Sequence, residues 1–195
     1  MSCGIDEGNL ETTPGLIKAW ITLSGILPSW KAKAPPRRNP TKNHKSARTY
    51  QAALLKSIRQ GQADETYLVV NISLLQLQQW KNIQCSPFGA VEKKGLDPQL
   101  EVRPIHDLSY PDAASTNDNL DPACLPDISY TTIVAIVRRI EELARTHPGI
   151  VIEILKGDVK SAFIHFMTHT EHVCWMGATL PEEYALIIDL AAPFG

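Results

Sequence analysis

The chain has 195 residues, of which 44% are hydrophobic and 21% charged, so it can bury a core the size of one large domain or of a small domain with an extension. A formal net charge of −2 excludes a global field that attracts nucleic acid or a membrane, which leaves only local patches for such contacts. The first residues lack the basic leader and apolar core of a signal peptide, and no run approaches the ~18 apolar residues of a membrane helix. We therefore expect an intracellular protein that makes no membrane contact.

The first 48 residues are predicted to be an N-terminal extension. The stretch Lys31–Arg48 contains seven Lys or Arg residues, three prolines and no acid. Such a composition buries too little apolar area to fold alone, which favours a solvated basic linker. The alternative is an arm that contacts phosphates.

A mixed set of elements follows. The apolar stripe of residues 46–60 predicts a helix that Gly61 ends, Tyr67–Ile72 is predicted to be a strand, and Leu74–Trp80 a short helix. Residues 86–95 and 101–109 predict a β-hairpin around the polar turn Gly95–Gln99.

This hairpin carries Lys93, Lys94 and Arg103 towards the same end. Three clustered cations without nearby partners can bind an anion such as a triphosphate, because guanidinium groups match phosphate oxygens. The alternative is an ordinary surface hairpin, since exposed hairpins often carry lysine.

Residues 111–126 have the composition of a loop, and an amphipathic helix follows, with Asp127 or Ser129 as its cap and Pro148-Gly149 as its end. We expect its apolar stripe to face the core. The stripe comprises Ile133, Ile136, Val137, Ile140, Leu143 and Ala144.

The stretch Ile150–Leu155 has one polar member, Glu153, and four β-branched residues, which predicts a central strand covered on both faces. Asp158 would then sit at the carboxyl end of this strand, where open α/β-type sheets place ligands. Further along, Ser161–Met167 could begin a helix, and Val173–Met176 and Tyr184–Leu190 are predicted to be strands.

Four blocks then follow one another in a specific order. They are Arg103-Pro-Ile-His-Asp-Leu-Ser-Tyr-Pro, Ser115-Thr-Asn-Asp, Lys156-Gly-Asp-Val-Lys-Ser-Ala-Phe and Ala192-Pro-Phe-Gly. In this order they resemble the reverse transcriptases of retrotransposons, and the likeness is greatest to elements that integrate through a tyrosine recombinase. The resemblance covers about residues 43–195.

The resemblance implies an RNA-directed DNA polymerase that acts on an RNA or DNA template-primer and a dNTP with Mg²⁺. Asp158 matches a carboxylate that binds both catalytic metal ions, which polarise the attacking hydroxyl and the leaving pyrophosphate. The remaining matches imply nucleotide contacts. They are Val159 (a backbone carbonyl on the metal), Phe163 (the sugar gate), Arg103 with Lys93 or Lys94 (the triphosphate), and Gly195 (template and nucleotide).

Some features of the family are missing from the sequence. The second carboxylate pair, on a Tyr-x-Asp-Asp-like hairpin, would come after the last residue, and the thumb and any ribonuclease H domain would lie further on. Ile164 and Ala191-Ala192 also depart from the usual residues. A single carboxylate cannot hold two dications, so we expect the chain to be inactive alone.

Two further groups of residues suggest other chemistry. His165, His169, His172 and Cys174 offer nitrogen and sulfur ligands in an H-x3-H-x2-H-x-C spacing, so a zinc-binding or structural interaction protein is an alternative. His106 and Asp107 are adjacent, but neighbours on a strand face opposite ways, which argues against an acid–base pair. A second alternative is a nucleic-acid-binding module without catalysis.

The expected fold class is α+β, with right-hand polymerase fingers and a truncated palm sheet. The expected parts are residues 1–48 (extension and basic linker), 49–149 (fingers-like) and 150–195 (partial palm). Because the palm would lack strands, we expect an exposed apolar sheet edge that a partner could cover.

Overall fold

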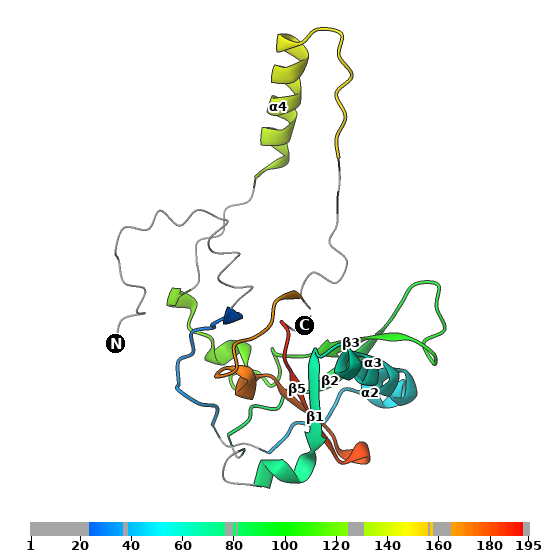
Figure 1. Cartoon of the computed structure of the whole chain (residues 1–195), viewed down its shortest axis with the longest axis vertical. Helices are drawn as coiled ribbons and strands as arrows, with labels where there is room; N and C mark the ends of the chain where they lie inside the picture. Colours follow the sequence, from blue (N-terminus) through cyan, green and yellow to red (C-terminus); the bar gives the residue numbers. More distant parts are fainter. Residues whose placement is uncertain are drawn as a thin grey trace. The chain divides into compact units, whose positions relative to one another are not determined.

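The computed structural model describes residues 24–36, 39–76, 80, 82–124, 131–155, 157 and 165–192 (Figure 1). Contacts divide the chain into two compact units. Unit 1 is Met1–Pro122 with Ser161–Gly195, and unit 2 is Ala123–Lys160. The described residues combine helices with antiparallel sheets, which confirms the mixed α+β class.

Two consecutive helices, α2 (Lys45–Thr49) and α3 (Gln51–Ala63), form where the sequence predicts one. The prediction that Gly61 ends the helix is wrong, because α3 continues to Ala63. Glycine is needed there for another reason. A Cβ at Gly61 would lie 2.3 Å from Cδ2 of Tyr67, so the missing side chain makes room for this ring.

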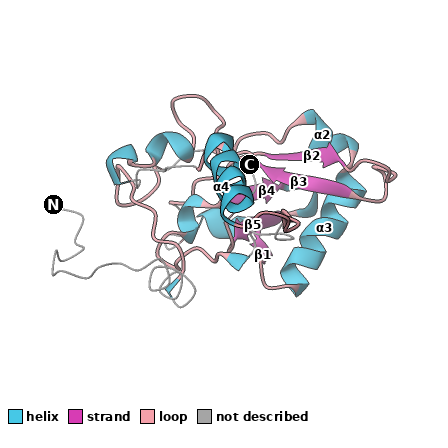
Figure 2. Ribbon diagram, turned by 90° about the horizontal axis from the view of Figure 1, so that it is seen from above, coloured by secondary structure: helices cyan, strands magenta, loops and turns pink. Residues whose placement is uncertain are grey.

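The main sheet of unit 1 has three antiparallel strands in the order β1 (Tyr67–Asn71), β5 (Ala185–Asp189), β4 (Gly177–Leu180). β1 and β5 are the predicted strands at these places. Ile187 pairs with Val69 on one side and with Ala178 on the other, so β5 is the central strand. Figure 2 shows the strands of this sheet as magenta arrows.

The predicted hairpin is confirmed. β2 (Phe88–Glu92) pairs with β3 (Val102–His106) in a two-stranded antiparallel sheet, in which Phe88 lies opposite His106 and Val91 opposite Arg103. α2 packs on β2, and α3 packs on β3 and β1 (Figure 2).

The core of unit 1 lies on both faces of β5. Ile187 belongs to the cluster shared with the helices and the hairpin, whereas Leu186 and Ile188 belong to a second cluster on the opposite face. The first cluster contains Ala47, Ala53, Leu54, Ile58, Phe88, Ala90, Val102, Ala178, Leu180 and Ile187, and the second Ile83, Cys85, Leu186 and Ile188.

Short 3₁₀ helices connect these elements: η1 (Ile72–Gln76), η2 (Asn117–Asn119), η3 (Pro122–Cys124), η5 (Val173–Trp175) and η6 (Pro181–Glu183). The strand predicted over Val173–Met176 is wrong. Residues Val173–Trp175 form η5, and Met176 N donates a turn hydrogen bond to Val173 O at 3.0 Å. The first residues of the helix predicted over Leu74–Trp80 belong to the 3₁₀ helix η1, which ends at Gln76. Residues 77–79 of the predicted helix lie outside the described residues.

Unit 2 contains α4 (Ile133–Thr146), the predicted amphipathic helix, which ends before Pro148-Gly149. Its N-cap is Thr132, whereas the predicted caps Asp127 and Ser129 lie outside the described residues. The expectation that its stripe faces the core is wrong. No residue of α4 is buried, and Ile133 is 74% exposed.

The central strand predicted over Ile150–Leu155 is also wrong. These residues have no regular secondary structure, and Leu155 is 97% exposed. Among the described strands none pairs with this segment, so its backbone groups lack the ladder that makes a strand.

None of the described helices has the length and apolar composition needed to cross a membrane.

Candidate functional site

The sequence-predicted site residues fall into two groups. Asp158, Val159, Phe163 and Gly195 lie outside the described residues, as do residues 161–164 of the predicted Ser161–Met167 helix. The three predicted triphosphate contacts, Lys93, Lys94 and Arg103, are described and lie on the β2–β3 hairpin.

The register of the hairpin brings two of these cations to one face. Arg103 lies opposite Val91, and the next pair on the same face, one step beyond the ladder, is Lys93 and Glu101. Arg103 and Lys94 are exposed, whereas Val102, the neighbour of Arg103, is buried in the core. The core contact of Val102 therefore fixes the outward direction of Arg103.

The expectation that these cations lack nearby partners is wrong for Lys93 and for Arg103. Lys93 forms an ion pair with Glu101, and the hydrogen bond from Lys93 holds the pKa of Glu101 below its ordinary value. On the adjacent edge of the hairpin, the Tyr50 hydroxyl donates to Glu92, which raises the pKa of Tyr50. An anion at this face must therefore compete with Glu101 for Lys93.

A buried polar pair that the sequence analysis missed lies between the two sheets. His106 and Asp189 are 3% and 4% exposed. Nε2 of His106 donates to the carbonyl oxygen of Gly177 at 2.9 Å, and Nδ1 lies 3.7 Å from Oδ2 of Asp189. That second distance is too long for a hydrogen bond, so the pair interacts electrostatically. Its members are 83 positions apart, and no sequence pattern links them.

Burial has the largest effect on the pKa of Asp189. Removal from water raises the pKa of Asp189, although His106 and the backbone N–H of Ala191 act in the opposite direction. Burial, together with the nearby Asp189, also raises the pKa of Tyr67, the residue opposite it in the sheet. Both members of the pair are buried in unit 1.

Asp107, next to His106, takes a different partner. Its Oδ2 lies 2.8 Å from Nε2 of His44, at the start of the helical segment. Asp107 and His106 therefore have different hydrogen-bond partners, His44 and the carbonyl oxygen of Gly177. The contact between Asp107 and His44 joins the hairpin to the basic stretch Lys31–Arg48. The backbone hydrogen bond from His44 N to Phe88 O, at 2.9 Å, joins the same two segments.

The proposed zinc ligands are only partly brought together. His169 and His172 gather with Glu171, which the sequence analysis did not include, and each offers a ligand atom within 4.8 Å of the others. His165 and Cys174 are outside this group. Burial, with the nearby His169, lowers the pKa of His172, and burial raises the pKa of the Cys174 thiol.

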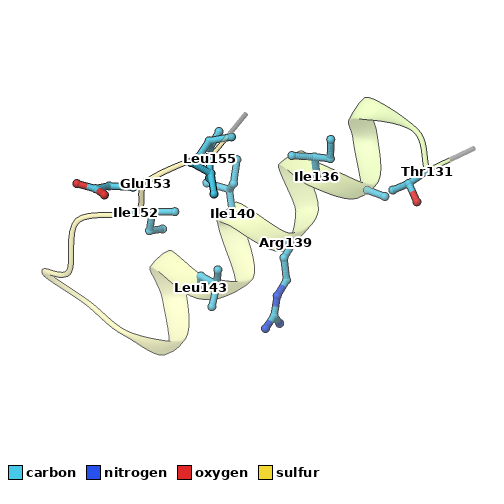
Figure 3. A pocket seen from close by; sticks show the side chains of 10 residues that line it. Thr131, Ile136, Arg139, Ile140, Leu143, Ile152, Glu153 and Leu155 are labelled. Carbon is cyan, nitrogen blue, oxygen red and sulfur yellow. The ribbon is translucent and has the colours of Figure 1, made fainter. Parts of the chain in front are cut away.

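Unit 2 has an open groove of about 420 Å³ between α4 and residues 152–155 (Figure 3). Its apolar lining includes Ile136, Ile140, Leu143, Ile152 and Leu155. Arg139 at its edge pairs with Glu142 at 2.7 Å. This groove can hold apolar side chains, and it contains no pair of groups suited to proton transfer or nucleophilic attack.

Compared with known proteins, the chain matches no family model, no curated protein and no solved structure.

Proposed function

We propose that the chain is a fragment of a reverse-transcriptase domain, related to RNA-directed DNA polymerases of retrotransposons, and that its hairpin contacts the triphosphate of a nucleotide or the phosphates of a nucleic acid. The four ordered sequence blocks support this proposal. In the same proposal the fingers correspond to residues 49–149, which include the β2–β3 hairpin, and Asp158 is the carboxylate that binds Mg²⁺.

The observation that carries the proposal is the direction of Arg103. It lies in the first of the four blocks, and it projects from a hairpin whose opposite face is fixed in the core by Val102 and Phe88. A guanidinium group can form two parallel hydrogen bonds to phosphate oxygens. Lys94 adds a second exposed cation at the hairpin end.

Equilibrium binding of a fluorescent dNTP and of a primer–template duplex tests this role. We expect Arg103→Ala to weaken binding of the ligand that the hairpin contacts, with Lys94→Ala acting in the same direction. Arg59→Ala is the matched control, because it removes an exposed arginine from α3, which is not part of the hairpin. Equal effects of Arg103→Ala and Arg59→Ala would contradict the proposal.

The two ligands separate the polymerase proposal from the alternative of a nucleic-acid-binding module. In the module, Arg103→Ala weakens duplex binding and lowers the magnitude of its salt dependence by about one unit, because one phosphate contact and its counterion are lost. In the polymerase fragment, dNTP binding also depends on Arg103. Binding of neither ligand would contradict both functions.

Primer extension tests the catalytic part. We expect the purified 195-residue chain to show no templated synthesis with Mg²⁺ or Mn²⁺, because one matched carboxylate does not fix two metal ions. Templated synthesis that Asp158→Asn abolishes would contradict the inactivity and would support the metal role of Asp158.

A further inference from the structure

The turn that contains His169, Glu171 and His172 is built from two segments far apart in the sequence. On one side, the backbone of His169 donates to Ile26 O at 2.9 Å, and Ile26 donates to Met167 O at 2.7 Å. On the other, the indole Nε1 of Trp30 donates to Nδ1 of His172 at 2.9 Å. The segment of residues 25–30 therefore holds the turn at both its ends.

The approach of these two segments is close. A Cβ on Gly25 would lie 2.9 Å from both His169 N and Met167 O, and Gly25 has a φ of +79°. Within the turn, His172 N donates to His169 O at 2.8 Å, and Trp175 N donates to His172 O at 3.1 Å. The ring of Trp30 stacks on buried Trp175, with centroids 4.5 Å apart and planes 17° apart. Backbone hydrogen bonds and the stacking of Trp30 on Trp175 thus hold the backbone that carries the two histidines.

The donor set has the composition of a transition-metal site. Two imidazoles and one carboxylate offer ligand atoms within 4.8 Å of one another, and the two histidine ring centroids are 6.0 Å apart. Two His and one Glu are a known three-residue ligand set for Zn²⁺, with a fourth position for water. Hard ions such as Mg²⁺ prefer all-oxygen sites, so this set selects against them.

The hydrogen bonds indicate which ring nitrogen of each histidine carries no proton. Nδ1 of His172 accepts the Trp30 indole N–H, and Nδ1 of His169 accepts the backbone N–H of Glu171 at 3.3 Å. An accepting nitrogen carries no proton, which is the form that ligates a metal. A metal ion on Nδ1 of His172 replaces the indole N–H, so metal binding and the Trp30 contact exclude each other.

We propose that His169, Glu171 and His172 form a binding site for a divalent transition-metal ion of the zinc class, and that loading the site releases the indole N–H of Trp30 from His172. The site is independent of the proposed nucleotide contacts, since it uses none of the hairpin residues. It also differs from the four-residue set suggested by the sequence spacing, because Glu171 replaces His165 and Cys174.

Isothermal titration of the full 195-residue chain, without a histidine tag, with ZnCl₂ tests the site. We expect one ion per chain. His169→Gln and Glu171→Gln should each weaken binding at least tenfold, since the loss of even a supporting residue typically costs about 10–100-fold in metal affinity. Glu171 is exposed and its replacement leaves the core intact, so this variant stays informative if His169→Gln is poorly folded.

His165→Gln and Cys174→Ser are the matched controls, because both belong to the sequence spacing and lie outside the group. They should bind Zn²⁺ as the unchanged chain does. Tryptophan emission should change on addition of Zn²⁺ and not of Mg²⁺, and Trp30→Phe should abolish this change while retaining binding. Absence of Zn²⁺ binding, or equal affinity in the Glu171→Gln and His169→Gln variants and the unchanged chain, would overturn the proposal.

Discussion

Two apolar stretches of the chain, residues 150–155 and β5, have almost the same composition and opposite environments. Each contains several aliphatic residues and one acid. β5 is the central strand of the main sheet, and Leu186 and Ile187 are 0% and 1% exposed. In the other stretch, Ile154 and Leu155 are 70% and 97% exposed.

The difference lies in the partners that each stretch meets. β5 follows β4 after the short η6 turn, where Tyr184 adopts a φ of +52°, so one neighbour forms locally. Its other neighbour, β1, lies more than 100 positions earlier in the sequence. Residues 150–155 follow α4 and have no partner among the described strands. An apolar run therefore becomes a buried strand only where the topology supplies neighbours.

The acidic residues of the two stretches differ in exposure in the same way. Asp189 at the end of β5 is 4% exposed and lies near His106, whereas Glu153 is exposed on unit 2. Burying a carboxylate costs free energy unless nearby groups compensate for the lost hydration. Asp189 in the sheet has such a neighbour, His106.

The largest difference should appear when one leucine is shortened in each stretch. Leu186→Ala should lower the free energy of unfolding by about 2–5 kcal/mol, because it leaves a cavity in a packed core. Leu155→Ala should change it by no more than about 0.5 kcal/mol, because an exposed side chain loses little on removal. Urea denaturation of both variants measures the difference, and equal losses would show that residues 150–155 are buried after all.

Glycine substitutions provide a second matched pair. A Cβ at Gly177 would lie 2.5 Å from Cγ2 of Ile83 and 2.8 Å from Gln84 O, whereas a Cβ at Gly157 meets no atom within 4 Å. Gly177→Ala should therefore cost about 1–3 kcal/mol through overpacking. Gly157→Ala should have almost no effect on the thermal midpoint. A stable Gly177→Ala variant would contradict the close packing of β4 against residues 83–85.

The smallest expected effect concerns the pH dependence of stability. Burial raises the pKa of folded Asp189 above its ordinary value of 3.8, so the folded state prefers the protonated acid. Its contribution to stability is then fully present below that value and is lost as the pH rises through the folded pKa. Asp189→Asn, which carries no charge, should gain stability relative to the unchanged chain as the pH rises.

Denaturation of both proteins at several pH values from about 4 to about 7 measures this gain. Glu153→Gln is the control, since Glu153 is exposed on unit 2 and should leave the pH dependence of stability unchanged. A gain of the same size in Glu153→Gln, or none in Asp189→Asn, would contradict the burial of Asp189.

The sequence predicts local elements well and their partners poorly. The helix at residues 46–60, the hairpin around Arg103 and the strand at Tyr184–Leu190 depend on periodicity and turn residues, and the structure has all three. Periodicity also predicts α4 correctly as a helix. It does not predict whether its stripe is covered, because covering depends on which other surface the fold brings to it.

The same limit applies to the candidate sites. The position of Arg103 on a hairpin face follows from alternation along a strand, so the sequence alone predicts it. The His106–Asp189 pair and the contact of Trp30 with His172 join residues 83 and 142 positions apart. Only the pairing of distant segments creates them. Glu171 is not part of the H-x3-H-x2-H-x-C spacing, which contains only His and Cys residues, so the sequence pattern does not predict it as a ligand.

Hydrogen–deuterium exchange compares the two stretches most directly. β5 forms ladders on both sides, and the N–H of Asp189 also donates to Met176 O at 2.9 Å, so the amides of residues 185–189 should be among the slowest to exchange. The amides of residues 151–155 should exchange at rates close to those of an unstructured peptide. Equally slow exchange in both stretches would contradict the account, because residues 150–155 would then have to be a paired strand.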